Sequence, residues 1–204
     1  MASISIIGTG NMGSAIARLA LAAGSDVQVV ARDGAKAEGV DPAATAATFG
    51  DALTGDVVVL ALPYPALDDV VATYGEQLTG KVVVDITNPL DFATFDDLVV
   101  PADSSAAAGL ADRLPGAKVV KAFNTNFAAT LATGTVGGLP TTVLVAGDDA
   151  DAKAALAATL DGSGVRVVDA GSLRRARELE AVGFLQLTLA AGEKTGWDAG
   201  LALV

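Results

Sequence analysis

The chain has 204 residues, is 51% hydrophobic, and carries 24 acidic against 13 basic side chains, which gives a formal net charge of −11 at pH 7. Nucleic acid is not expected as a partner, because neutralising its phosphates requires a basic face. The absence of cysteine and histidine from the sequence excludes disulfides, zinc sites, thiol nucleophiles and histidine-based triads.

No linker, repeat or charge block divides the sequence, so we expect residues 1–204 to form a single domain, with 174–204 as its C-terminal helix and tail. The longest apolar stretch, Ala181–Ala191, includes Gln186 and Thr188, and it is shorter than the roughly 20 residues that span a membrane. The N-terminus lacks the basic segment of a signal peptide. These features predict a cytoplasmic protein with no membrane as a partner.

Short valine-rich runs alternate with helical patterns along the chain. The predicted strands are Ser3–Ile7, Val27–Ala31, Val57–Leu62, Val82–Ile86, Lys118–Ala122, Thr142–Ala146 and Val165–Asp169. The predicted helices are Met12–Ala23, Pro65–Tyr74, Ser104–Leu114, Ala150–Leu160 and Arg174–Ala191. The stretch Ala43–Thr48 is ambiguous and could add a short strand. This alternation predicts the α/β class, as a Rossmann-type doubly wound and mostly parallel sheet with a C-terminal helix.

Ligands of a doubly wound sheet bind at the carboxyl ends of its strands. In this chain the rule selects five segments, which are Gly8–Gly13, Ala31–Asp33, Leu62–Pro65, Thr87–Pro89 and Ala122–Asn126.

The first of these segments, Gly8-Thr9-Gly10-Asn11-Met12-Gly13, fits the pattern G-x-G-x-x-G between a predicted strand and a predicted helix. In this context the pattern is typical of a turn that binds a dinucleotide. The first glycine permits the tight turn, the second lets the backbone approach a pyrophosphate, and the third packs helix against strand. The N–H groups of Asn11 and Met12 then face the phosphates at the positive end of the helix. An ordinary glycine-rich turn is the alternative.

The second predicted strand ends at Ala31, where enzymes that use NAD usually carry an acid that binds the ribose 2′-OH. Arg32 follows it, and a missing acid beside an arginine favours the 2′-phosphate of NADP. The guanidinium suits a phosphate and can stack on adenine. Lys36 is near enough in sequence to help, and Thr9 could donate its hydroxyl. Alternatively, Arg32 pairs with Asp33 or faces solvent.

Six motifs together resemble the F420-dependent NADP oxidoreductase family. They are G-T-G-N-M-G at Gly8–Gly13, A-R at Ala31–Arg32, L-P at Leu62–Pro63, N-P at Asn88–Pro89, V-K-A-F-N-T at Val120–Thr125 and D-A-G-S-L at Asp169–Leu173. V-K-A-F-N-T is the most specific, and the resemblance covers nearly the whole chain. The chain is also similar to the cytosolic reductase domains of the six-transmembrane metalloreductases, whose own role we do not expect because no predicted segment spans a membrane.

The resemblance implies NADP(H) as the cofactor and hydride transfer between NADPH and a flavin-like acceptor, the family's named one being the 8-hydroxy-5-deazaflavin of coenzyme F420. It places Thr9, Arg32 and Lys36 at the 2′-phosphate, and Leu62, Pro63 and Ala122 around the nicotinamide. The family usually has Ser or Thr before the arginine, so Ala31 removes one hydrogen bond to the phosphate. The predicted cofactor-binding residues are therefore Gly8, Thr9, Gly10, Asn11, Met12, Gly13, Ala31, Arg32, Lys36, Leu62, Pro63, Tyr64, Asn88, Pro89 and Ala122.

Two further features have alternative interpretations. Asn124 and Thr125 could position a carbonyl of the acceptor ring, or cap a helix that starts near Phe127. Tyr64 could stack on a ring, or shield the helix that Pro65 begins.

Three basic residues, Arg174, Arg175 and Arg177, lie within four positions. Arginines in a first helical turn oppose the helix dipole, so a ligand or an acid should compensate them. Arg174 and Arg175 are therefore candidates to receive an anionic tail of the substrate, and the alternative is pairing with Glu178, Glu180 or the many other surface acids. No carboxylates form a convincing acid–base pair, so we expect no dedicated catalytic residue and no metal.

The predicted partner is a small-molecule redox acceptor. Ala181–Ala191 is apolar almost all round, so it should be covered, either by the sheet or by a second copy in a homodimer. One rival function is an NADP-dependent imine or ketone reductase, which would need a proton donor from Tyr or Lys in this histidine-free chain. The other rival is a non-catalytic NADP-sensing module.

Overall fold

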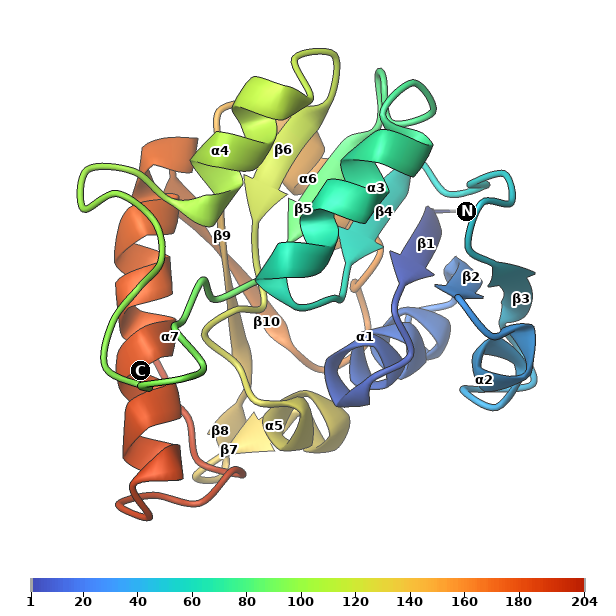
Figure 1. The fold of residues 1–204 in the computed structure, drawn as a ribbon. Coiled ribbons are helices and arrows are strands. Elements are labelled where there is room, and N and C mark those ends of the chain that lie inside the picture. Colours follow the sequence, from blue (N-terminus) through green and yellow to red (C-terminus); the bar gives the residue numbers. More distant parts are fainter. Residues whose placement is uncertain (1, 204) are drawn as a thin grey trace.

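A computed structural model describes residues 2–203 and contains one large sheet with helices on both of its faces (Figure 1). The strands are β1 (Ser3–Ile7), β2 (Asp26–Ala31), β3 (Thr45–Thr48), β4 (Val57–Leu60), β5 (Val82–Asp85), β6 (Lys118–Lys121), β9 (Thr142–Gly147) and β10 (Arg166–Gly171). The α-helices are α1 (Asn11–Ala22), α2 (Gly34–Glu38), α3 (Leu67–Tyr74), α4 (Ala106–Arg113), α5 (Ala128–Thr133), α6 (Ala150–Ala158) and α7 (Ala176–Ala191). Single 3₁₀ turns, η1 (Tyr64–Ala66) and η2 (Leu173–Arg175), precede α3 and α7, and a small hairpin joins β7 (Thr135–Val136) to β8 (Leu139–Pro140).

The strand order of the sheet is β10-β9-β6-β5-β4-β1-β2-β3. Every pairing in it is parallel except the one between β6 and β9. The predicted mostly parallel, doubly wound sheet is therefore confirmed. The chain order reverses at β1, which pairs with β2 on one side and with β4 on the other. A ligand of such a sheet binds at this reversal, beyond the carboxyl ends of the strands.

Two apolar clusters hold the helices against the two faces of the sheet. Side chains of a strand alternate between faces, and β4 illustrates this, because Val57 and Val59 join one cluster while Val58 and Leu60 join the other. The first cluster includes residues of α1, α5 and α6, and the second includes residues of α3, α4 and the start of α7. Valine runs in the sequence thus mark strands that are covered on both faces.

The structure also differs locally from the predicted elements. β4 and β6 end at Leu60 and Lys121, so Leu62 and Ala122 follow these strands instead of closing them. The short elements α2, β7 and β8 were not predicted, because segments of two to five residues carry too little periodicity. The β7–β8 hairpin turns at Gly137 and Gly138, whose φ angles of 58° and 81° fit the two-residue turn that glycines favour. Within residues 2–203 no helix combines the length and the apolar character needed to cross a membrane.

Candidate nucleotide and acceptor site

The glycine turn between β1 and α1 is fixed by close backbone contacts. A Cβ atom added at Gly8, where φ is +120°, would lie 2.1 Å from the carbonyl oxygen of Ala61. One added at Gly13 would lie 2.0 Å from the carbonyl oxygen of Gly8. At Gly10, by contrast, an added Cβ meets no atom within 4 Å. The first and third glycines are therefore required by packing, whereas the second leaves an open face that a pyrophosphate can approach.

The N-terminus of α1 is free to bind an anion. Its capping residue Gly10 offers no side-chain hydrogen bond, and the first turn contains no acidic residue. The first N–H groups of a helix lack partners within the helix and carry its partial positive charge. These features suit the pyrophosphate of a dinucleotide, which the residues present would hold through Asn11 and Met12 backbone N–H groups.

A cavity of 350 Å³, here called the ribose cavity, lies beside this turn at the ends of β1 and β2. Seven of the predicted cofactor residues line it together, namely Gly8, Thr9, Ala31, Arg32, Lys36, Leu62 and Pro63. Leu62 and Pro63 were predicted beside the nicotinamide, but they line this cavity, next to the residues predicted for the 2′-phosphate. These residues end or follow three different strands, β1, β2 and β4, and the parallel sheet brings the carboxyl ends of these strands to one edge.

Arg32 does not take the partner that the sequence suggested. It pairs with Asp69 of α3, and the two side chains are 75% and 58% exposed. Asp33 is engaged elsewhere, since it caps α2 by accepting the N–H of Ala35 at 3.1 Å. Exposed ion pairs contribute only about 0–1 kcal/mol. Arg32 can therefore exchange Asp69 for a phosphate at little energetic cost.

A larger cavity of 730 Å³, here called the ring cavity, opens on the other side of the turn. Four predicted residues line it, namely Asn11, Met12, Asn88 and Asn124. Phe123, Asn126 and Trp197 also line it and were not predicted, although the first two belong to the segment that was singled out after β6. The ring of Trp197 packs against Phe127, with centroids 5.3 Å apart. The walls are thus mostly apolar with a few amides, as in many cofactor sites.

A strained turn at Phe123 sets the direction of the chain after β6. Phe123 has φ +61°, and across it the N–H of Asn124 donates to the carbonyl of Ala122 at 2.8 Å, which makes a γ-turn. A bulky residue in this region costs on the order of 1–3 kcal/mol, and such strain clusters at functional sites. Phe123 reaches the ring cavity, whereas the side chain of Ala122 is fully buried in the core and lines neither cavity. The predicted contact of Ala122 with the nicotinamide could be made only through its backbone.

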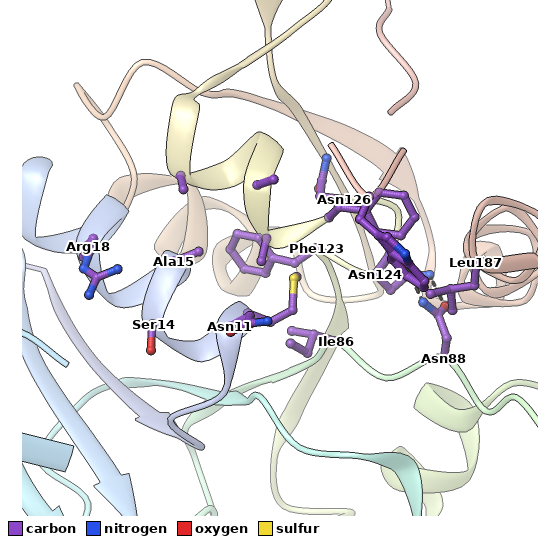
Figure 2. Close-up of a pocket in the computed structure, with 16 residues that line it drawn as sticks. Asn11, Ser14, Ala15, Arg18, Ile86, Asn88, Phe123, Asn124, Asn126 and Leu187 are labelled. Atoms are coloured by element: carbon purple, nitrogen blue, oxygen red, sulfur yellow. Dashed lines mark hydrogen bonds between the residues drawn. The ribbon is translucent and has the colours of Figure 1, made fainter. Parts of the chain in front are cut away.

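Asn88 and Asn124 bind each other at the end of the ring cavity nearest α7 (Figure 2). Asn88 donates to the carbonyl of Asn124 at 2.9 Å, and Asn124 donates to Asn88 Oδ1 at 2.9 Å and to the carbonyl of Leu179 at 2.8 Å. A Cβ at Gly183 would lie 2.4 Å from Asn88 Oδ1, so this glycine lets α7 approach the pair. Both side-chain N–H groups of Asn124 are occupied, which leaves none for a ring carbonyl.

The alternative role of Asn124 and Thr125 as helix caps is wrong. The residue that caps α5 is Phe127, and no side chain donates or accepts a capping hydrogen bond there. Thr125 is 5% exposed and lies outside both cavities. Asn124 instead uses its side-chain amide on Asn88 and on the carbonyl of Leu179.

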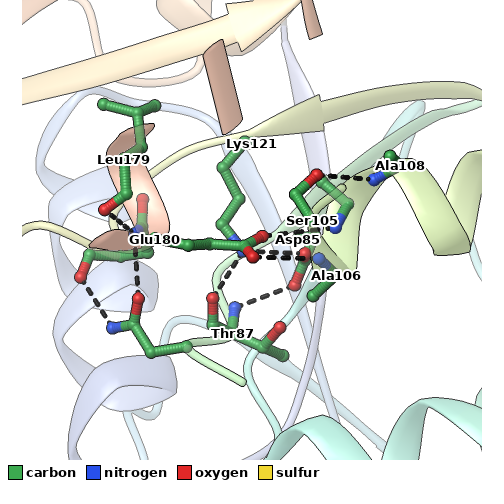
Figure 3. Close-up of polar contacts among 11 residues, drawn as sticks. Asp85, Thr87, Ser105, Ala106, Ala108, Lys121, Leu179 and Glu180 are labelled. Carbon is green, nitrogen blue, oxygen red and sulfur yellow. Dashed lines mark hydrogen bonds and ion pairs between the residues drawn. The ribbon is translucent and has the colours of Figure 1, made fainter. Parts of the chain in front are cut away.

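Behind the ring cavity lies a buried charge cluster formed by Lys121, Asp85 and Glu180, at 0%, 0% and 1% exposure (Figure 3). Lys121 Nζ lies 2.9 Å from Asp85 Oδ2 and 2.8 Å from Glu180 Oε1, and it also donates to the carbonyl of Thr87. Glu180 accepts the N–H of Ala106 at 2.9 Å, at the start of α4. Burial raises the pKa of Glu180, and Lys121 opposes that rise. The cluster ties β5, β6, α4 and α7 together.

Other predicted residues lie outside both cavities. Tyr64 is partly buried against the apolar cluster under α3, and Pro89 accepts the N–H of Val99 at 2.7 Å. Arg174 is exposed, and Arg175 lies 3.2 Å from Glu178, as the pairing alternative proposed. On α7, Leu185 and Leu189 are 58% and 38% exposed, so the sheet covers only part of this helix. The homodimer stays a prediction.

Comparison with known proteins shows which proteins this chain is similar to. Residues 3–89 match the profile of the family described as NADP oxidoreductase coenzyme F420-dependent. The F420-dependent NADP reductase of Methanocaldococcus jannaschii is 34% identical over 134 residues, which are 63% of this chain and 59% of that protein. Metalloreductase STEAP3 of Rattus norvegicus is 29% identical over 180 residues, which are 88% of this chain and 36% of that protein. The chain thus spans less than two thirds of each curated relative.

A solved structure matches over almost its whole length. It is described as a putative F420-dependent NADP-reductase from Arthrobacter sp. FB24, has a TM-score of 0.84 and 29% identity, and covers 98% of this chain and 99% of its own. The resemblance predicted from the motifs is therefore confirmed: the chain is related to the coenzyme F420-dependent NADP oxidoreductases, and its residues 3–89 carry that family's pattern.

Proposed function

We propose that this protein is an NADP(H)-dependent oxidoreductase that transfers hydride between NADPH and a deazaflavin such as coenzyme F420, or a flavin. The observation that carries the proposal is the position of the glycine turn between two cavities. Gly8 and Thr9 line the ribose cavity, while Asn11 and Met12 line the ring cavity. A dinucleotide with its pyrophosphate at the N-terminus of α1 would extend one end into each of them.

The ribose cavity supports NADP over NAD. No acidic side chain replaces Ala31 at the end of β2, and Arg32, Lys36 and Thr9 all line the same cavity. Two cations and a hydroxyl suit a 2′-phosphate. The two carboxylates that also line the cavity, Asp33 and Asp69, already have partners, since Asp33 caps α2 and Asp69 pairs with Arg32. NADPH, when bound, supplies the hydride.

The ring cavity supports an acceptor that is itself a redox ring. Its volume of 730 Å³ falls in the range of cofactor sites, about 300–1,000 Å³. Met12, Phe123 and Trp197 give it apolar walls that exclude water and hold a flat ring. Because the chemistry of hydride transfer resides in the two rings, the protein's task is to align them, which can contribute several kcal/mol to lowering the barrier.

Reduction of an imine or ketone is less well supported. That reaction needs a proton donor within hydrogen-bonding reach of the substrate. The described residues that line the ring cavity include no Tyr, Lys, Asp or Glu that could serve as this donor. An NADP-sensing module would bind NADPH in the same way and show no turnover.

A turnover panel tests the proposal. The purified protein is incubated with NADPH and, separately, coenzyme F420, FMN, riboflavin, a cyclic imine and a ketone, and NADPH oxidation is followed. We expect oxidation with one of the deazaflavin or flavin acceptors and none with the imine or the ketone. Oxidation by the carbonyl or imine compounds alone would establish the rival class, and tight NADPH binding without any turnover would establish the sensor.

A further inference from the structure

We infer that Arg18 recognises a phosphate or similar anionic group on the ligand of the ring cavity, so that the preferred acceptor is a redox ring with an anionic side chain. The inference rests on the proposed function, because it takes the ring cavity as the acceptor site. It assigns to α1 a second role beyond holding the pyrophosphate.

Arg18 stands at one end of an elongated cavity. Figure 2 shows it opposite Asn88 and Asn124, with Phe123 between them. Met12, Ala15 and Arg18 follow one another at intervals of three residues and line the cavity from one helix, since such residues share a helix face. The rise from Met12 to Arg18 is about 9 Å, a span that the ribityl chain of a flavin can bridge.

The wall opposite Arg18 is made of small side chains. The residues of α5 that line the cavity are Ala128, Ala129 and Ala132. The part of the cavity wall that α5 supplies therefore carries no side chain longer than a methyl group. A thin, flexible substituent of the ligand can run along this alanine-lined groove toward Arg18, while the ring stays between Met12 and Phe123.

The charge of Arg18 is available to a ligand. One of its N–H groups donates to the carbonyl of Val40 at 3.0 Å, and a guanidinium has four more. No ion pair found among residues 2–203 involves Arg18. It is also the one charged side chain on the described walls of the ring cavity. In a chain of net charge −11, which repels anions over most of its surface, this position is where an anionic group would be attracted.

The arginines on η2 and α7 are less suitable for this role. Neither Arg174 nor Arg175 lines the ring cavity, and Arg175 is paired with Glu178. The alternative role for Arg18 is structural, since its bond to Val40 anchors the segment after α2. A structural role would affect all ligands alike, whereas recognition of an anion would affect only ligands that carry one.

FMN and riboflavin separate these roles, because they share one ring system and differ by a phosphate. The full-length protein is saturated with NADP⁺, and the Kd of each flavin is measured from the quenching of its fluorescence. We expect FMN to bind more tightly than riboflavin. Arg18→Gln should raise the Kd of FMN about five- to tenfold, as expected for a charged hydrogen bond at an exposed side chain, and leave that of riboflavin unchanged. Arg177→Gln, an exposed position outside the cavity with the same change in charge, should alter neither.

Each other result overturns the inference. Equal losses for both flavins would show a structural role, and an FMN Kd that ignores Arg18→Gln but follows Arg177→Gln would show a general charge effect. In either case flavin binding itself persists, so the proposed function stands. Failure of both flavins to bind the NADP⁺-loaded protein would overturn the assignment of Arg18 to a flavin phosphate, whereas the proposed function is tested separately by the turnover panel, which includes coenzyme F420.

Discussion

Replacing Lys121 with methionine tests the buried charge cluster behind the ring cavity. Methionine keeps much of the length of lysine but removes an ammonium that donates to Asp85, Glu180 and the carbonyl of Thr87. Two carboxylates at 0% and 1% exposure would then lack their counter-ion. Breaking a buried pair in this way costs about 3–5 kcal/mol, out of a total stability of about 5–15 kcal/mol for a typical domain. We expect a loss of that size in the free energy of unfolding, measured with urea at pH 7.

The pH dependence of this loss follows from the pKa of Glu180, which burial raises above its ordinary value of 4.5 while Lys121 opposes the rise. A carboxyl group whose pKa is raised by folding contributes stability that is present below its unfolded pKa and is lost as pH rises through its folded pKa. Without Lys121 the folded pKa rises further, so the loss caused by Lys121→Met should be smaller near pH 4.5 than at pH 7. Adding Glu180→Gln to the Lys121→Met variant removes one of the two carboxylates that lack a counter-ion, so it should restore part of the stability at pH 7. A loss below about 1 kcal/mol, or one that is independent of pH, would refute the reasoning.

Three further predictions concern the cavities and α7. Arg32→Ala should weaken NADPH binding by about 1.5–3 kcal/mol, the usual contribution of a charged hydrogen bond, and leave NADH nearly unaffected; equal losses in titrations of the two cofactors would exclude a 2′-phosphate contact. Replacing Arg174 and Arg175 together with glutamine should leave the KM of the acceptor unchanged, because neither side chain lines a cavity. Gly183→Ala should destabilise the protein by about 1–3 kcal/mol through overpacking and lower kcat, since its Cβ would lie 2.4 Å from a side-chain oxygen of the cavity wall. The matched control Gly109→Ala, at a helical position with no atom within 4 Å, should leave kcat unchanged and raise Tm, and a similar drop in both variants would dismiss the steric argument.

The ribose cavity was the most predictable part of the site. The predictable residues lie at the first two strand ends, where motif and position agree: Gly8 must be glycine because of Ala61, and Arg32 follows the last residue of β2. Such positions are set by the backbone of the doubly wound sheet, so local sequence carries most of the information. The partner of Arg32 was not predictable, because Asp69 comes from a helix 37 residues away.

The ring cavity was less predictable, because long-range packing forms it. Trp197 reaches it from beyond the end of α7, and Arg18 reaches it from a helix that was interpreted only through its first turn. The buried charge cluster also lacks a local signal. Lys121 looks like an ordinary polar residue at a strand end, and its partners are 36 and 59 residues away along the chain. Only the assembled sheet and helices bring these groups together.

The γ-turn at Phe123 connects this buried cluster to the proposed hydride transfer. A phenylalanine keeps a left-handed backbone conformation only where several interactions of the surrounding structure hold it there. Here both flanks are held: Lys121, two residues earlier, is bonded to Asp85 and Glu180, and Asn124, one residue later, is bonded to the carbonyl of Leu179. Both sets of interactions involve α7, because Glu180 and Leu179 are neighbouring residues of that helix. For the proposed hydride transfer between two rings, alignment of the rings is a main contribution that the protein can make. The residues that fix Phe123 from behind should therefore matter to the rate as much as those that touch the ligands.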